Sequence, residues 1–346
     1  SFNNEDDSIE SPLLAGGEGL VSGSSYDGGF SDTTTASFSV DFMVGSEEGK
    51  GIESATETDG DEAVEFNYSF QIDLNTSFTG EDSLDISIDA GDASGTATGD
   101  ATSPNAEFDG NATSDVLTVD GIAYTFPVGD AMTVFVGSDS DGSSLFTTAC
   151  VYGGPSNTLD DCGNVNAGIT GGGVAAGASY DVGNGFSAAF GIQATETGIL
   201  TDETMDDAYA FNAAYIADNY GVSVTYASIE DGTATGDNDD TYTALNGYIA
   251  FEGYPTLSAG VEYGNDDGST DDFDDQTMAY FIGSTYPVGP GELGVAWGTH
   301  NENDGMKENT DDEIMIEAYY SYPVNDSMTV TPLIYSKEQL STAKPD

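Results

Sequence analysis

Positive charge is nearly absent from this chain. Its 346 residues include 63 aspartates and glutamates, no arginine and only four lysines (Lys50, Lys307, Lys337 and Lys344), and the formal net charge is -59. A protein that binds nucleic acid needs clustered positive charge to neutralise phosphates. The composition therefore excludes a nucleic-acid partner. Acidity of this kind also suits a solvated surface in a saline habitat, where screening limits repulsion to about 8 Å or less.

Catalytic and metal-binding signatures are scarce as well. There is no phosphate-binding loop, the single histidine is His300, and acidic residues are so frequent that no pair of them is informative. We predict that the protein is not an enzyme. Acidic clusters at 231–241 and 266–276 contain oxygen ligands of the kind that Ca²⁺ prefers, but they lack EF-hand spacing and GGxGxD repeats. We expect solvated loops and no cofactor there, with Ca²⁺ as the alternative.

Only two cysteines are present, Cys150 and Cys162, in a stretch rich in Gly, Pro, Asn and Asp. Their spacing fits neither a Cys-x-x-Cys redox motif nor a zinc site. We expect a disulfide that closes a short loop and stabilises the protein by about 2–4 kcal/mol. A disulfide favours an oxidising, exported setting.

Long apolar runs are missing. No stretch approaches the ~18 apolar residues of a membrane-spanning helix, and residues 1–12 lack the basic and apolar regions of a signal peptide. A chain of this kind spans a membrane only as a β-barrel. We interpret residues 1–32, which are acidic and rich in Gly and Ser, as a leader or linker, and residues 33–346 as one β domain.

What the chain has in abundance is strand and turn residues: 45 Gly, 19 Tyr and 17 Phe. A hydrophobic content of 38% also argues against general disorder. Fifteen runs alternate between apolar and polar residues, at 33–44, 62–76, 84–91, 114–126, 131–138, 170–182, 185–195, 206–217, 220–229, 241–252, 256–264, 276–286, 291–299, 311–322 and 327–336.

The connections between these runs alternate in length. Short turns such as "GNG", "DNYG" and "PVNDS" are followed by long acidic loops, at 45–61, 92–113, 139–169, 196–205, 230–240, 265–275 and 300–310. Short turns at one end and long loops at the other are typical of an up-and-down barrel of the outer-membrane type. Greek-key sandwiches do not sort their loops in this way.

Within each run, large apolar residues share one face and polar residues share the other. In the run at 62–76, Phe66, Phe70 and Ile72 alternate with Asn67, Gln71 and Asp73. A carboxylate buried without a partner would cost several kcal/mol, and four lysines are too few to pair with so many acids. The carboxylate face must therefore meet water, and we predict that the apolar face meets lipid.

Aromatic residues recur where strands meet short turns. Phe126, Tyr286 and Tyr322 each precede Pro-Val, and Tyr254 precedes Pro255. An aromatic row on one rim is typical of an interfacial girdle. The alternative is that Tyr and Phe merely prefer strands.

Four stretches, "LNTSFTGEDSLDISIDAG" (74–91), "YTFPVGDAMTVFVG" (124–137), "CVYGGPSNTLDDCGN" (150–164) and "YSYPVNDSMTVTPLIY" (320–335), resemble the barrel of cyanobacterial outer-membrane porins. This carbohydrate-porin-like family usually carries a surface-layer-homology domain and is often described as iron-uptake porins. The resemblance implies a sixteen-stranded barrel in the outer membrane of a cyanobacterium-like Gram-negative cell, a homotrimer, and passage of small solutes. Compared with that family, we expect the peptidoglycan-anchoring domain and the final strand to be missing from the sequence given, and attachment to the cell wall is not inferred.

For such a barrel we predict passive, cation-preferring diffusion of small hydrophilic solutes or inorganic ions. The acids on polar faces would line the lumen and attract cations: Asp41, Asp73, Asp85, Asp89, Glu262, Glu313 and Glu317. The alternative is that they only keep the lumen hydrated.

The third long loop of this chain is at 139–169. In porins generally, the third loop folds into the barrel and narrows it. By that resemblance, Asp139, Asp141, Asp160 and Asp161 are candidates for an acidic constriction. The open alternative is an outward-facing loop with an ordinary disulfide. The competing class for the whole chain is a secreted acidic β-rich adhesin, filament or surface-layer protein, whose strands pair between chains or pack as two sheets.

Overall fold

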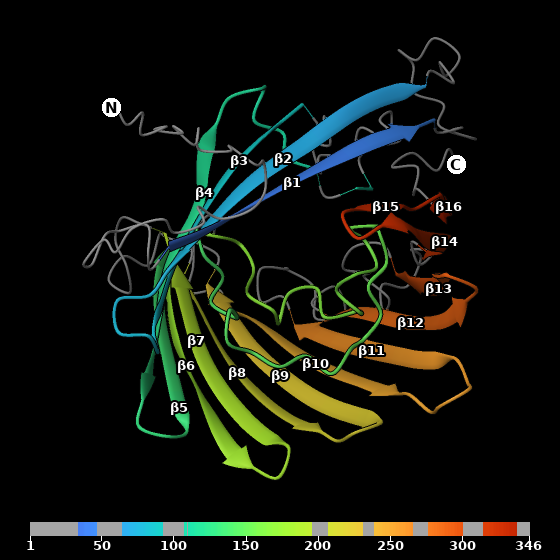
Figure 1. Cartoon of the computed structure of the whole chain (residues 1–346). Coiled ribbons are helices and arrows are strands. Elements are labelled where there is room, and N and C mark those ends of the chain that lie inside the picture. The colour runs from blue at the N-terminus through green and yellow to red at the C-terminus, as the bar shows by residue number, and fades with distance from the viewer. Residues whose placement is uncertain are drawn as a thin grey trace, which may run out of the picture.

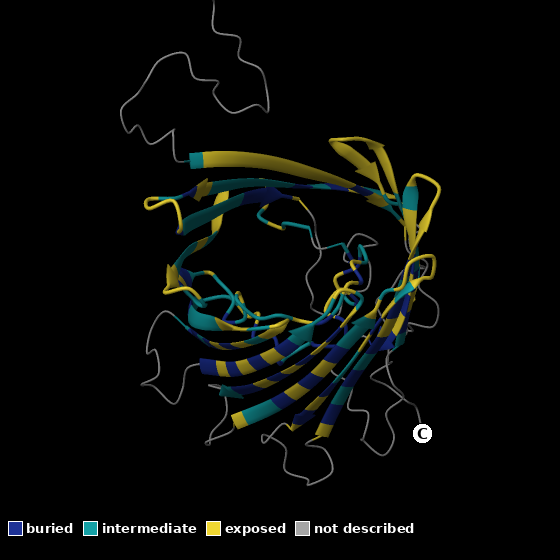
Figure 2. Ribbon diagram, turned by 60° about the horizontal axis from the view of Figure 1, so that its bottom comes forward, coloured by how far each residue is buried: buried dark blue, intermediate teal, exposed yellow. Residues whose placement is uncertain are grey.

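The computed structural model describes residues 34–46, 64–92, 107–108, 110–195, 207–230, 239–265, 276–299 and 314–337. These residues form strands, turns and one long inner connection, and none of them forms a helix that could cross a membrane. The strands form one curved sheet that surrounds a central space (Figures 1 and 2).

Within the described residues the sheet has sixteen strands. In chain order they are β1 (Thr34–Gly45), β2 (Glu65–Thr76), β3 (Ser83–Gly91), β4 (Thr118–Val128), β5 (Met132–Ser138), β6 (Val174–Gly183), β7 (Phe186–Ala194), β8 (Asp207–Ile216), β9 (Tyr220–Glu230), β10 (Asp239–Ile249), β11 (Thr256–Asn265), β12 (Gln276–Val288), β13 (Gly291–Thr299), β14 (Ile314–Asn325), β15 (Met328–Val330) and β16 (Leu333–Lys337).

Each strand from β1 to β14 pairs antiparallel with the next, as the sequence predicted for an up-and-down barrel. The last predicted run, 327–336, is two short strands: β15 continues the order after β14, and β16 pairs with β14 further along. Pro332 lies at the break, because proline has no N–H to donate to a β ladder. The count of sixteen thus arises from this division of the last run and not from an added strand.

Short turns at one end of the barrel are stabilised locally. In the β2–β3 turn, the Asp82 carboxylate accepts hydrogen bonds from the backbone N–H groups of Phe78 (3.0 Å) and Thr79 (2.8 Å) and from the hydroxyl of Ser77 (2.8 Å). The Tyr124 hydroxyl donates to the other carboxylate oxygen at 2.6 Å. This hydrogen bond from Tyr124, together with those inside the turn, holds the pKa of Asp82 well below its usual range.

The β6–β7 turn depends on backbone conformations that few residues adopt. Gly183, Asn184 and Gly185 have φ angles of 89°, 56° and 86°. Glycine adopts positive φ without a steric penalty, and asparagine tolerates it better than most residues. The "GNG" sequence therefore permits the chain to reverse within three residues.

Buried and exposed residues alternate along many strands of the sheet (Figure 2), and the exposed ones are the large apolar residues. On β8, the inward residues Ala210, Asn212 and Ala214 are buried, while Tyr209 and Phe211 on the outward face are exposed. Phe66 on β2 is 60% exposed. Large exposed apolar rows on many adjacent strands are typical of a barrel whose outer surface contacts lipid.

Buried apolar residues gather inside the barrel, where an inner loop packs on the strands. One cluster joins Tyr152 and Leu159 of this loop to Phe281 and Met315 of the wall. A second joins Ala167 and Ile169 to the inward residues of strands β8 to β10. The core of the protein is therefore the contact between the inner loop and the barrel wall.

Candidate permeation pathway

The inner loop consists of residues 139–173, between β5 and β6, and it lies inside the barrel (green in Figure 1). Its backbone N–H groups donate to inward side chains of strands β7, β8, β9 and β11. The contacts are Gly142 to Gln193 Oε1 at 2.9 Å, Thr147 to Asn212 Oδ1 at 3.0 Å, Ala149 to Ser223 Oγ at 2.8 Å and Val151 to Ser258 Oγ at 3.2 Å. Of the two orientations that the sequence left open, the inward one is present.

Glu262 on β11 holds the second half of the inner loop. Its carboxylate accepts the backbone N–H of Asn166 at 3.0 Å and of Ala167 at 2.8 Å, and the Asn166 side-chain amide at 3.2 Å. Glu262 is only 2% exposed. A single carboxylate that accepts several N–H groups ties together the segments that carry them. This carboxylate is therefore an anchor for the loop.

Glu317 on β14 holds the middle of the loop. The Tyr152 hydroxyl donates to Glu317 Oε1 at 2.5 Å, and the Tyr319 hydroxyl donates to the Gly153 carbonyl at 3.1 Å. Glu317 is 0% exposed. Burial, and then the hydrogen bond to Glu317, raises the pKa of the Tyr152 phenol far above its usual value, so Tyr152 stays a donor.

The predicted disulfide between Cys150 and Cys162 is present, with the two Cα atoms 6.5 Å apart. It closes the central part of the inner loop, and the Cys162 carbonyl accepts the Asn246 side-chain amide at 2.9 Å. A Cβ added to Gly260 would lie 1.9 Å from this carbonyl oxygen. Glycine at this position of β11 therefore allows the loop backbone to lie directly on the wall.

Strands β1, β2 and β3 form the acidic wall, defined by four aspartates. The register places each of them opposite a neutral polar residue: Asp41 opposite Ser69, Asp73 opposite Ser87, Asp85 opposite Asn75 and Asp89 opposite Gln71. Like charges directly opposite each other destabilise a β pair. The sequence thus supports dense negative charge on this wall without placing two carboxylates face to face.

Neighbouring donors hold these carboxylates in place. Asp73 Oδ1 accepts hydrogen bonds from the Gln71 amide at 2.7 Å and the Ser87 hydroxyl at 3.0 Å. Asp85 Oδ1 accepts the Asn75 amide at 2.6 Å. These hydrogen bonds fix the orientation of the two carboxylate groups on the wall.

The structure separates the predicted pore-lining residues into two groups. Asp41 is exposed, Asp73 and Asp85 are partly exposed, and Asp89 is buried beside Thr118, whose hydroxyl donates to it at 2.6 Å. Glu262 and Glu317 lie under the inner loop and have almost no contact with water. Glu313 lies outside the described residues.

The constriction candidates also differ among themselves. Asp139, Asp160 and Asp161 are exposed on the inner loop, whereas Asp141 is half-buried. Burial raises the pKa of the Asp141 carboxyl. The acidic wall and the exposed part of this loop are therefore two carboxylate-bearing surfaces among the described residues of the barrel.

The predicted girdle residues lie at the short-turn ends of their strands: Phe126 on β4, Tyr286 on β12, Tyr322 on β14, and Tyr254 between β10 and β11. Sequence reasoning missed further aromatic residues at this rim. Phe186 and Tyr215 have ring centroids 4.5 Å apart, and Tyr215 and Tyr220 are 5.8 Å apart. Their signal was proximity to a short turn, without the Pro-Val motif.

The acidic clusters at 231–241 and 266–276 lie almost wholly outside the described residues. In the described parts of the chain, no group of three or more His, Cys, Asp or Glu side chains is arranged to hold a metal ion. The Ca²⁺ alternative for these loops stays a prediction.

The barrel has an apolar outer face, short turns at one end with long loops at the other, and a loop folded into its polar interior. Together these features define a porin, a barrel that lets solutes diffuse across an outer membrane. The sequence matches the family model described as "Carbohydrate-selective porin, OprB family" over residues 27–335. The chain belongs to this family, and it is a channel of the Gram-negative outer membrane, not an enzyme. No curated protein matches the chain.

Solved porins have the same fold at low identity. A mutant of the Rhodopseudomonas blastica porin has a TM-score of 0.55 and 12% identity, with 88% of this chain and 94% of that chain covered. A loop-deletion mutant of OmpT, an outer membrane protein of Vibrio cholerae, has a TM-score of 0.54 and 12% identity, with 89% and 94% covered. These likenesses support the barrel fold.

Proposed function

We propose that this porin gives cation-preferring passage to small hydrophilic solutes and inorganic ions. The observation that carries the proposal is the acidic wall. Asp41, Asp73 and Asp85 on this wall are at least partly exposed, Asp89 is buried beside them, and the described residues contain no cluster of basic side chains. Fixed carboxylates in a water-filled lumen raise the local concentration of cations and repel anions.

The narrow part of the pathway, in this proposal, runs between the acidic wall and the inner loop. Asp139, Asp160 and Asp161 are exposed on that loop, so carboxylates would border the passage from both sides. Glu262 and Glu317 contribute indirectly, because they fix the loop and not because they meet the solute.

The family description names carbohydrates, and a neutral sugar gains nothing from net charge. For sugars, the acidic wall offers hydrogen-bond acceptors on its carboxylates and donors on residues such as Gln71 and Asn75. We therefore propose that the channel also passes small sugars. Because neutral sugars carry no current, electrical recordings report the preference for cations.

The four sequence stretches that resemble cyanobacterial porins support an origin of that kind and leave iron species as a candidate cargo. The excess of acid supports a saline habitat. The wide exposure of apolar residues on β1, such as Phe38 and Phe42, supports contact between subunits of a homotrimer, which chemical cross-linking in detergent tests.

The test of cation preference is the double variant Asp73→Asn with Asp85→Asn. We expect a clearly smaller cation-over-anion permeability ratio, because two fixed charges are removed from the acidic wall while side-chain size is kept. The ratio is obtained from the reversal potential of reconstituted channels in a salt gradient. Asp326→Asn, in the exposed β14–β15 turn, is the matched control. A ratio equal to that of the control would show that the wall only hydrates the lumen.

A further inference from the structure

Lys337 lies on the inner face of β16 and is the only lysine among the described residues. Its neighbours on that face, Leu333 and Tyr335, pack against the cluster of inner-loop and wall residues. The Lys337 side chain is 17% exposed. An ammonium group withdrawn from water to this extent requires a partner of opposite charge.

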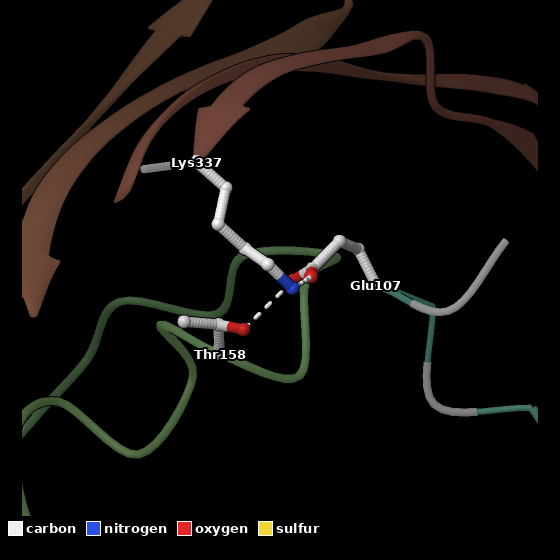
Figure 3. A network of polar contacts seen from close by, with 3 residues as sticks. All are labelled: Glu107, Thr158 and Lys337. Carbon is white, nitrogen blue, oxygen red and sulfur yellow. Dashed lines mark hydrogen bonds and ion pairs between the residues drawn. The ribbon is translucent and has the colours of Figure 1, made fainter. Parts of the chain in front are cut away.

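That partner is Glu107, from the second long connection of the chain (Figure 3). The Glu107 side chain is 4% exposed and forms an ion pair with Lys337. Thr158 of the inner loop donates its hydroxyl to Glu107 Oε2 at 2.7 Å, and the Asn157 N–H donates to the Glu107 carbonyl at 2.8 Å. One carboxylate thus joins three segments: the second connection, the inner loop and β16.

Four residues after Glu107, the chain is attached to the other side of the sheet. The Asn111 N–H donates to Ser69 Oγ at 3.2 Å, and its side-chain amide donates to the Phe70 carbonyl at 3.4 Å. A Cβ added to Gly91 would lie 2.1 Å from the Asn111 carbonyl oxygen, so glycine permits this close approach. The attachment point is on β2 and β3.

These two attachments lie on opposite sides of a gap in the sheet. Among the described strands, β1 pairs only with β2 and β16 pairs only with β14, and β1 and β16 do not pair with each other. The hydrogen bonds of Asn111 secure the side near β1, and the ion pair of Glu107 secures the β16 side. Residues Glu107 and Asn111 of one connection are therefore attached to β16 on one side of this gap and to β2 on the other.

We propose that Lys337 is a positioning residue of the channel, whose ion pair with Glu107 fixes the second connection and the inner loop against β16 and so sets the width of the lumen beside the β1–β16 gap. The pair carries no net charge. It therefore acts on the geometry of the passage, separately from the cation preference proposed for the acidic wall.

The two partners provide a test because their removal has opposite effects on charge and the same effect on geometry. Lys337→Met and Glu107→Gln should both raise the mean conductance. Both should also raise the frequency of open-channel fluctuations, by roughly tenfold, as expected for the loss of a charge-assisted hydrogen bond. The measurement is single-channel recording of the full chain in planar bilayers. The exchanged pair, Lys337→Glu with Glu107→Lys, should restore values close to those of the wild type.

Glu252→Gln, in the exposed β10–β11 turn, is the control for the Glu107 variant. Fluctuations at the control level in both single variants would overturn the proposal. So would opposite shifts of reversal potential without a change of fluctuations, because the pair would then act through charge alone. If a single variant fails to insert, Thr158→Val, which removes one hydrogen bond of Glu107 and no charge, decides the question by the same recording.

Discussion

Replacing Glu262 with alanine is expected to release the second half of the inner loop from the barrel wall. The substitution leaves the N–H groups of Asn166 and Ala167 without their acceptor in a buried site, and each such loss costs about 1–3 kcal/mol. Because two such groups lose their acceptor, we expect a total loss of about 2–6 kcal/mol in the free energy of unfolding. Denaturant titration of the protein folded into lipid vesicles measures this loss.

The same variant is also expected to change conduction, because the inner loop occupies the interior. Its channels should fluctuate among several conductance levels, whereas Glu262→Gln, which keeps an acceptor oxygen, should show a smaller effect. Glu252→Ala, in an exposed turn, is the control. A Glu262→Ala protein as stable as this control, with a single steady conductance, would mean that the carboxylate does not hold the loop.

Replacing Val224 with arginine is the second change with a large expected effect. Val224 is near the middle of β9, 44% exposed on the outward face, between Ala213 of β8 and Leu245 of β10. At the bilayer midplane an arginine costs about 2–4 kcal/mol, whereas an exposed substitution in a water-soluble protein usually changes stability by less than about 0.5 kcal/mol.

Denaturant titration in vesicles distinguishes the two cases for Val224→Arg. Val324→Arg, at the short-turn end of β14, serves as a rim control with an expected cost of about 0–1 kcal/mol. If both variants cost the same small amount, the outward face is not in lipid.

The barrel could be predicted because apolar and polar residues alternate along each strand, and this alternation is visible in the sequence. Phe66, Phe70 and Ile72 recur at every second residue, and this period determines which side chains share a face whatever the face contacts. The same alternation correctly placed the fourteen strands from β1 to β14. It missed the division at Pro332, although proline inside a run is a known sign of an interrupted strand.

The interior could not be predicted with the same success. Alternation places Asp73 and Glu262 on the same kind of face, but it does not reveal that the inner loop covers one and not the other. The loop contacts Glu262 across 95 or 96 residues of sequence and Glu317 across 165. No local pattern encodes contacts at such separations, and the Lys337–Glu107 pair, 230 residues apart, has no sequence signal at all.

The outer-membrane barrel requires that its outward apolar face contacts lipid. The chain's single tryptophan tests this contact directly. Trp297 on β13 is 39% exposed, on the outward face between Ile282 and Ile316. In vesicles made with brominated acyl chains, we expect blue-shifted Trp297 fluorescence that bromine quenches strongly and aqueous iodide barely affects. Red-shifted emission that iodide quenches and brominated lipid leaves unchanged would contradict the account.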